Sequence, residues 1–306
     1  MDIAVIGSNM VDLISYIDKM PKEGETLEAP DFKIGCGGKG ANQAVAAAKM
    51  GSKVMMMTKV GDDLFADNTI KNLQNYGIDT EFTTKVSGTS SGVAPIFVDQ
   101  ESKNRILIIK GANQYLLPED IDNAAEKLKT CSLIVLQLEI PLQTVYRAIE
   151  FGNEHGIPVI LNPAPASKEL DLDYVLKCDY FIPNESELEI LTGMPVDSKE
   201  QIRAAASTLV DKGIKNVIVT MGSRGVMWLM KDKVYTIDSF KVNAIDTTGA
   251  GDSFIGCFAH YLVKDGDVLQ ALKMATAFAA LSVTKQGTQI SYPSAEELKL
   301  FMKTYS

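Results

Sequence analysis

The chain has 306 residues, of which 46% are apolar and 23% charged, a composition typical of a globular protein with a sizeable buried core. Its formal net charge of −9 argues against nucleic acid as a partner, so an anionic substrate would need a local positive site. The four cysteines are scattered and no histidines cluster, which argues against a disulfide framework and a zinc site: Cys36, Cys131, Cys178 and Cys257.

The beginning of the chain runs directly into a short strand. Residues 1–7 carry no basic region of the kind found in secretion signals. No apolar run approaches the roughly 20 residues that a membrane-spanning helix needs. We therefore expect a cytoplasmic protein with reduced cysteines and no membrane partner.

Short β-rich runs alternate with helical patterns along most of the chain. Continuous apolar runs bounded by turn residues predict buried strands at 3–7, 53–58, 133–137, 159–162, 180–183 and 217–221. Helical patterns follow these runs at 40–50, 63–76, 119–129, 141–155, 184–193, 198–213, 252–264, 268–285 and 294–304. This order predicts an α/β fold with a parallel sheet covered by helices on both faces.

Two regions, about 12–34 and 90–110, break this alternation. They carry strand-like segments at 13–17, 92–98 and 105–109 with no helix between them, and the polar turn 99–104 predicts a hairpin. These segments predict a small β sheet that stands off the main body as a lid. Because so few strands are marginally stable unless one face is covered, we expect a homodimer through the lids.

The stretch 246–252 reads Asp-Thr-Thr-Gly-Ala-Gly-Asp and precedes an apolar run typical of a buried helix. Gly249, Ala250 and Gly251 allow the backbone to approach a ligand closely, and a helix start presents unpaired N–H groups that attract an anion. Asp252 then lies in the first turn, where its carboxylate could accept the proton of an attacking hydroxyl during phosphoryl transfer. Alternatively, Asp252 simply caps the helix.

The glycine-rich stretch 35–42 formally contains the G-x-G-x-x-G pattern of dinucleotide-binding proteins, so a nicotinamide-dependent oxidoreductase is one alternative. The strand before it is very short and belongs to the predicted lid. Lys39 and Asn42 also add polar groups that such a turn does not need. Glycine backbone with one ammonium and one amide suits a polyhydroxylated ligand better.

Further polar groups follow predicted strands, where ligands collect in a parallel sheet. Asn184 and Glu187 lie one turn apart, so they either cap a helix or arrange water and Mg²⁺ beside phosphate oxygens. Residues 220–225 form either a nucleotide contact or a plain hairpin turn. The carboxylates of Asp12 and Glu139 could accept hydrogen bonds from sugar hydroxyls or be ordinary surface charges.

Taken together, these stretches resemble the ribokinase family of carbohydrate kinases, the PfkB type. The resemblance runs nearly end to end, and 246–252 is the family's most specific signature. The matching stretches are Gly7-Ser8 with Asp12, 37–42, 137–139, Asn184 with Glu187, 222–225 and 246–252. The resemblance implies a single catalytic domain over 1–306, with a doubly wound sheet and a lid that clasps the lid of a second subunit.

The resemblance also implies an ATP-dependent sugar kinase in which Asp252 is the catalytic base and the backbone of Gly249, Ala250 and Gly251 forms an anion hole. It implies that the sugar meets Asp252 and Met10, Val11, Asp12, Gly38, Lys39, Gly40, Ala41, Asn42 and Glu139. ATP, with Mg²⁺, would meet Gly251, Asp252, Asn184, Glu187, Thr220, Met221, Gly222, Ser223, Arg224, Gly225 and Thr276. A monovalent cation, K⁺, would lie beside Asp246, Thr248, Ser282, Lys285, Gly287 and Ser291, partly on backbone carbonyls.

One departure concerns the substrate. Many ribose kinases carry Asn two residues before the first-strand Asp, whereas this chain has Met10. A thioether is a poor hydrogen-bonding group but packs well against a methylene, which favours 2-deoxy-D-ribose, phosphorylated on its 5-hydroxyl. The stretches 7–12 and 21–26 look most like the branch of the family that acts on deoxyribose. Some ribose kinases also have Met at this position, so D-ribose is the alternative, and a catalytically silent sugar-binding protein is a third.

Overall fold

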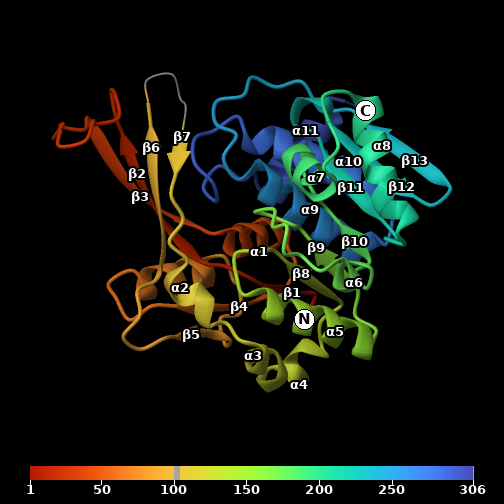
Figure 1. Ribbon diagram of the computed structural model, residues 1–306, viewed down its shortest axis with the longest axis horizontal. Coiled ribbons are helices and arrows are strands. Elements are labelled where there is room, and N and C mark those ends of the chain that lie inside the picture. Colours follow the sequence, from red (N-terminus) through yellow and green to blue (C-terminus); the bar gives the residue numbers. More distant parts are fainter. Residues whose placement is uncertain (100–103, 306) are drawn as a thin grey trace.

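The computed structural model describes residues 1–99 and 104–305, and a nine-stranded sheet forms its centre (Figure 1). Its strands, in spatial order, are β13 (Lys233–Ile237), β12 (Val226–Met230), β11 (Val217–Thr220), β10 (Tyr180–Phe181), β9 (Val159–Leu161), β8 (Leu133–Leu136), β1 (Ile3–Ile6), β4 (Val54–Val60) and β5 (Thr83–Lys85). Every pairing from β11 to β5 is parallel, which confirms the predicted mostly parallel sheet. The antiparallel strands β12 and β13, like the short edge strand β5, were not predicted.

Helices cover both faces of this sheet. The α-helices are α1 (Lys39–Lys49), α2 (Ala66–Asn75), α3 (Pro118–Asn123), α4 (Ala125–Leu128), α5 (Leu142–His155), α6 (Leu172–Val175), α7 (Glu185–Thr192), α8 (Lys199–Asp211), α9 (Ala250–Asp265), α10 (Val268–Ser282) and α11 (Ala295–Lys303). Two short 3₁₀ turns are η1 (Gly111–Tyr115) and η2 (Gly222–Arg224). The helix predicted at 119–129 is therefore two short helices, α3 and α4.

Two apolar cores confirm that the sheet is doubly wound. In β1, Ala4 and Ile6 face a core shared with α5 and α8, whereas Ile3 and Val5 face a core shared with α1, α9 and α10. All four side chains are completely or almost completely buried. A strand buried on both faces gives the continuous apolar run on which its prediction rested. No helix among the described residues is both long and apolar enough to cross a membrane.

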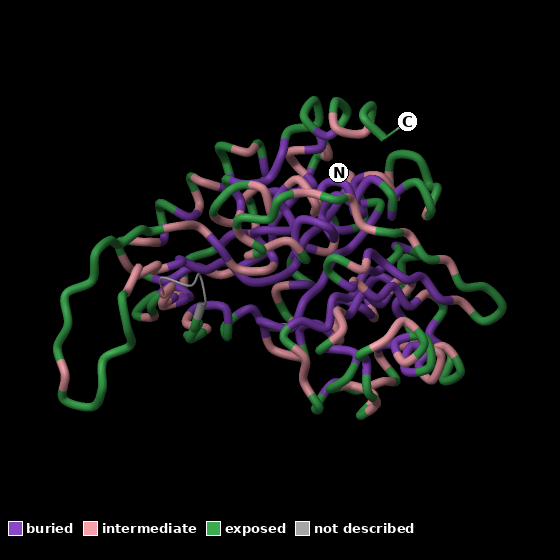
Figure 2. Tube along the Cα trace, turned by 90° about the horizontal axis from the view of Figure 1, so that it is seen from above, coloured by how far each residue is buried: buried purple, intermediate pink, exposed green. Residues whose placement is uncertain are grey.

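The predicted lid is a separate four-stranded sheet that stands off the body (Figure 1). Its order is β3 (Asp31–Gly37), β2 (Met10–Tyr16), β6 (Gly92–Val98) and β7 (Asn104–Ile106). The antiparallel pairing of β6 with β7 confirms the predicted hairpin, although residues 100–103 of its turn lie outside the described residues. Figure 2 shows this end of the molecule largely exposed, beside a buried body.

The close packing of α1 against α9 depends on Gly256. A Cβ added at Gly256 would overlap the carbonyl oxygen of Gln43 and the side chain of Ala46, both in α1. The two helices can therefore approach each other only because residue 256 lacks a side chain. Their contact places the first turns of both helices, which contain the glycine loop and Asp252, next to one another.

We expect Gly256→Ala to lower the melting temperature, because overpacking of this kind costs roughly 1–3 kcal/mol. Gly251→Ala in the same helix is the matched control, since its added Cβ meets nothing within 4 Å. Alanine is favoured over glycine in helices by about 1 kcal/mol, so the control should melt at the parent temperature or above it. Equal melting temperatures for the two variants in thermal unfolding would contradict the packing argument.

Candidate functional site

The carboxylate of Asp252 lies between the first turns of α1 and α9. Asn42 Nδ2 donates a hydrogen bond to its Oδ2 and Gln43 Nε2 donates one to its Oδ1, each at 3.0 Å. Asp252 is only 8% exposed. Asp252, the predicted base, and the glycine loop at 35–42 are far apart in the sequence but lie at a single site in the fold.

The residues predicted to hold the sugar surround this carboxylate. Asp12 comes from β2, Glu139 follows β8, and both are buried. Glu139 Oε2 accepts hydrogen bonds from the backbone N–H of Lys39, at 3.0 Å, and from the hydroxyl of Ser8. Gly38 adopts a φ of 90°, and an added Cβ there would overlap the backbone of Met10. The glycine loop is therefore pressed against the start of β2.

Lys39 is the cation of the site. Burial acts to lower the pKa of its ammonium, but the carboxylates of Asp252, Glu139 and Glu187 act against it and the net effect is a raised pKa. Glu187 lies in α7 and is predicted to meet ATP, whereas Glu139 is predicted to hold the sugar. The ammonium therefore interacts electrostatically with carboxylates of both predicted groups. Lys39 therefore stays protonated and positively charged among these three carboxylates.

Two carboxyl groups of the site have raised pKa values. Burial, followed by repulsion from Glu139 and Asp252, raises the pKa of Asp12 to about 7. Burial also raises the pKa of Glu187, although the hydrogen bond from the backbone of Asn184 and the charge of Lys39 oppose this effect. The site is thus a cluster of buried carboxyl groups, which favours hydrogen-bond donors and cations as partners.

The main chain at the start of α9 leaves free space beside Gly251. Gly249 caps the helix with a φ of 73°, and its carbonyl oxygen accepts a hydrogen bond from Tyr292 Oη at 3.0 Å. An added Cβ at Gly251 would meet nothing within 4 Å. First-turn amides have no acceptor within their own helix, so the N–H groups of Gly251 and Asp252 are suited to an anion.

Asn184 and Glu187 cap α7 in the manner of a capping box. Asn184 Oδ1 accepts from the backbone N–H of Glu187 at 2.8 Å, and Glu187 Oε2 accepts from the backbone N–H of Asn184 at 2.9 Å. Asn184 also forms a parallel bridge with Thr220. The two segments predicted to meet ATP are therefore neighbours at the same edge of the sheet.

The other residues predicted to meet ATP differ in their surroundings. Residues 222–225 belong to the tight connection between β11 and β12, so this stretch is also a hairpin turn. Arg224 forms an ion pair with Glu185 and donates to the carbonyl oxygens of Val196 and Asp197. Thr276 donates to Leu272 within α10. These contacts support the protein, and a role toward ATP remains a prediction for both side chains.

The residues predicted to surround a monovalent cation lie close together beside the start of α9. Asp246 Oδ1 accepts from the backbone and hydroxyl of Thr248, and its Oδ2 accepts from the N–H of Gly287 at 2.9 Å. Ser291 donates to a backbone carbonyl, and Lys285 pairs with Glu297. Ser282, at the end of α10, has its hydroxyl 3.2 Å from that of Ser253. These hydrogen bonds hold the predicted ligands in place, and their role toward a monovalent cation remains a prediction.

A divalent cation has few side-chain ligands here. Within residues 1–99 and 104–305, no group of three or more His, Cys, Asp or Glu residues could hold a metal ion. The carboxylate of Glu187 fits Mg²⁺ that is held mainly by water and phosphate oxygens, which is the coordination that Mg²⁺ favours. The residues therefore suit a metal that arrives with the nucleotide.

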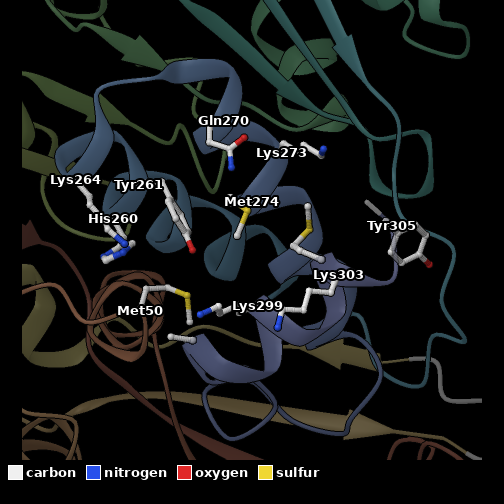
Figure 3. A pocket seen from close by; sticks show the side chains of 12 residues that line it. Met50, His260, Tyr261, Lys264, Gln270, Lys273, Met274, Lys299, Lys303 and Tyr305 are labelled. Carbon is white, nitrogen blue, oxygen red and sulfur yellow. The ribbon is translucent and has the colours of Figure 1, made fainter.

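A separate surface pocket of about 380 Å³ lies at the opposite ends of α1, α9 and α10, beside α11 (Figure 3). His260 and Lys264 line it from α9, and Lys299 and Lys303 line it from α11. None of the predicted site residues lines this pocket, and neither does any carboxylate. Because the predicted base and the predicted substrate residues all lie elsewhere, we do not regard it as the reaction site.

Comparison with known proteins decides the family. The profile of the pfkB family carbohydrate kinases matches residues 1–295. The chain belongs to this family. Membership confirms the resemblance in the sequence and makes the chain a sugar kinase, which leaves the nicotinamide-dependent oxidoreductase without support. The strand before the glycine loop is β3 of the lid, as the sequence suggested, but the expectation that it is very short was wrong, since β3 has 7 residues and reaches Gly37.

Relatives and solved structures agree over nearly the whole chain. A deoxyribokinase from Salmonella typhimurium is 68% identical over 99% of both chains, and a ribokinase from Mus musculus is 39% identical over 97% of this chain and 94% of its own. A ribokinase from Thermotoga maritima has a TM-score of 0.90 at 38% identity and covers 99% of both chains. An Arabidopsis thaliana ribokinase complexed with ribose and ATP has a TM-score of 0.92 at 30% identity and covers 99% of this chain and 98% of its own.

Several residues of the site were not predicted from the sequence. Ser8 orients Glu139, Gln289 donates to Asn42 at 3.0 Å, and Gln43 donates to Asp252. Ser8 belongs to one of the stretches that carry the family resemblance, and Gln43 directly follows another. Their positions could therefore have indicated a role in the site. Nothing in the local pattern around Gln289 indicates its partner, because 247 residues separate it from Asn42.

The raised pKa of Asp12 makes a prediction for stability. Between the ordinary value of 3.8 and about 7, the folded state binds more protons at Asp12 than the unfolded state, so stability falls as pH rises through this window. Asp12→Asn removes this ionisation. We expect the melting temperature of the ligand-free variant to exceed that of the parent by an amount that grows from pH 4 to pH 8 and corresponds to roughly 2–4 kcal/mol.

The exposed Asp232, in the turn between β12 and β13, provides the control. Asp232→Asn makes the same chemical change on the surface and should leave the melting temperature close to that of the parent. A difference between Asp12→Asn and the parent that does not vary with pH would show that Asp12 does not titrate in this way.

Proposed function

We propose that the protein phosphorylates the 5-hydroxyl of 2-deoxy-D-ribose with ATP, giving 2-deoxy-D-ribose 5-phosphate. The geometry that carries this proposal is the meeting of Asp252, the open amides before α9 and the ammonium of Lys39 at one site. The choice of sugar is supported by the deoxyribokinase that shares 68% of this sequence. It is also supported by Met10, which is 2% exposed and lies two residues before Asp12.

In this reaction the chain binds the sugar before it moves a proton. Asp12 and Asn42 would hold the ring hydroxyls and Lys39 would add a charged donor, so that the 5-hydroxyl faces Asp252. Asp252 would accept the hydroxyl proton as the oxygen attacks the phosphorus. The N–H groups of Gly251 and Asp252 would stabilise charge on the transferred group, which passes through a loose transition state.

ATP would lie across the carboxyl edge of the sheet. Asn184 and the turn 220–225 are neighbours there, and an Arabidopsis relative is complexed with ribose and ATP. Mg²⁺ bound to the phosphates would neutralise part of their charge, near Glu187. K⁺ would sit on carbonyls beside Asp246 and reinforce the positive potential before α9, so turnover should be assayed with and without K⁺.

D-Ribose is the alternative substrate, because several relatives at 37–39% identity are ribokinases. The two sugars differ only in the 2-hydroxyl. A buried thioether leaves that hydroxyl without a partner, but apolar pockets reject an added hydroxyl by only about a hundredfold. Measurable turnover of ribose is therefore part of the proposal.

We expect Met10→Asn to reverse or narrow the preference for deoxyribose over ribose in kcat/KM, by roughly 10- to 100-fold. An ATP-consumption assay over a panel of pentoses and hexoses measures this ratio for the parent and the variant. Met20→Asn, at an exposed position in the lid, is the control for the substitution itself. A parent enzyme that prefers ribose would overturn the proposed substrate, and one that consumes ATP with none of the sugars would overturn the proposed function.

We also propose that the lid joins two copies of the chain into a homodimer. Its sheet exposes large apolar side chains that include Phe32, Ile34 and Leu107, each more than half exposed. A small sheet with such side chains in water is marginal, and a second lid would cover them.

Ile34→Lys should therefore shift the protein from dimer to monomer in sedimentation velocity, because it would place a charge in the covered face. Leu64→Lys is the matched control, since Leu64 is 96% exposed and lies outside the lid. A parent protein that sediments as a monomer, or a dimer unaffected by Ile34→Lys, would argue against assembly through the lid.

A further inference from the structure

A line of buried side-chain amides ends on Asp252. Gln137 Nε2 donates to Gln43 Oε1 at 2.6 Å, and Gln43 Nε2 donates in turn to Asp252 Oδ1 at 3.0 Å. The same nitrogen of Gln43 lies 3.3 Å from Asn162 Oδ1. Gln43 and Gln137 are completely buried. Water is therefore not available to replace either of them as a partner.

The charge of Asp252 sets the direction of this line. An ionised carboxylate only accepts hydrogen bonds, so the NH₂ group of Gln43 must face it and the carbonyl of Gln43 must face Gln137. Gln137 must then present its own NH₂ group, which turns its oxygen away. That oxygen is buried without a hydrogen-bond partner, whereas the opposite orientation would bring two carbonyl oxygens together.

The unpaired oxygen of Gln137 therefore has a physical explanation. A buried acceptor without a partner costs about 1–3 kcal/mol, and the structure tolerates this cost because Asp252 fixes the order of donors and acceptors. Gly7 makes room for the arrangement, since an added Cβ at this position would overlap the oxygen of Gln137. The amide line therefore requires glycine at position 7.

A second line reaches the other oxygen of Asp252. Asn72 Nδ2 donates to Gln289 Oε1 at 2.7 Å, Gln289 Nε2 donates to Asn42 Oδ1, and Asn42 Nδ2 donates to Asp252 Oδ2, both at 3.0 Å. The carbonyl of Asn42 is therefore occupied. Its second N–H remains for the oxygen of a sugar hydroxyl, so this line also contains a residue that we place against the substrate.

We infer that Gln43, held by Gln137, is a positioning residue that fixes the plane of the Asp252 carboxylate. This inference rests on the proposed role of Asp252 as the base. Gln43 does not touch the reacting atoms in this arrangement and acts only through Asp252. Two donors on opposite oxygens prevent rotation of the carboxylate, and each donor stabilises its negative charge.

Gln43→Met is the direct test, because methionine has nearly the shape of glutamine but cannot donate. We expect kcat to fall on the order of 10- to 100-fold, since misplacement of a reacting group has effects of this size. The KM for the sugar should change less than about threefold, and the acid limb of the kcat–pH profile should move to higher pH. A role confined to packing would not move that limb.

Gln137→Met tests the same line without touching Asp252. We expect a smaller loss of kcat and a shift of the acid limb in the same direction. The double variant should be no slower than Gln43→Met alone, because Gln137 acts only through Gln43. Gln74→Met is the control: it also removes one amide hydrogen bond, to Thr80, but Gln74 belongs to neither line, so kcat should stay unchanged.

The inference is overturned if Gln43→Met keeps the parent kcat and pH profile, or if the effects of the two substitutions multiply. If Gln43→Met does not fold, Gln137→Met alone decides, through the shift of its acid limb. A parent enzyme without sugar turnover would instead refute the proposed function. The amide line would then be tested in thermal unfolding, where Gln43→Met and Asp252→Ala together should lower the melting temperature by less than the sum of the two.

Discussion

The close approach of α9 to α1 is the constraint on which the site depends. It requires Gly256 at the crossing, and it brings the first turn of each helix to the same point. The segment after α10 is tied to this pair: Lys49 Nζ, from the last turn of α1, donates to the carbonyl oxygens of Gln289 and Tyr292. The hydroxyl of Tyr292 then reaches the carbonyl of Gly249, which caps α9. The segment after α10 and the first turn of α9 are thus held by one hydrogen-bond network that starts at α1.

The charges of the site explain why it suits these substrates. Asp12, Glu139, Glu187 and Asp252 are all buried, and Lys39 is the cation whose pKa responds to three of them. Such a cluster is costly in the free protein, as the raised pKa of Asp12 shows. In the proposed function, sugar hydroxyls would supply hydrogen-bond donors to this cluster, and a nucleotide with Mg²⁺ would bring positive charge beside its phosphates. Binding would therefore offset part of the cost of burying these carboxyl groups.

Sequence reasoning located the groups that carry charge or lack a side chain, because these have local signatures. Asp252 follows small residues at the start of α9. Lys39 lies in a glycine-rich loop at the start of α1. The amide partners were not predictable in this way, since Gln43 meets Gln137 and Asn162 only through packing across 94 and 119 residues. The strands β12 and β13 were missed for a related reason. The chain turns tightly at Gly222 and then forms β12 and β13, which pair in antiparallel fashion at the edge of the sheet. The alternation of strands and helices up to β11 indicated parallel pairing.

Strand β2 belongs to the lid and also carries Met10 and Asp12, which are predicted to hold the sugar. The choice of sugar and the position of the lid are therefore connected through this strand. Met10 begins β2 and pairs with Gly37 of β3 and Gly92 of β6, while Asp12 pairs with Gly35 two residues further on. The same strand then continues into the exposed part of the lid. Two of these glycines make room for polar side chains, because an added Cβ at Gly37 would overlap the carboxylate of Asp12 and one at Gly92 would overlap the amide of Asn113. Because Met10, Asp12 and the exposed part of the lid lie on one strand, a lid motion transmitted along β2 would move Met10 and Asp12 relative to Asp252. A sugar that fits Met10 poorly would then hold the lid, and with it the hydroxyl to be phosphorylated, away from the base. Discrimination at the 2-position would consequently appear in kcat as well as in KM.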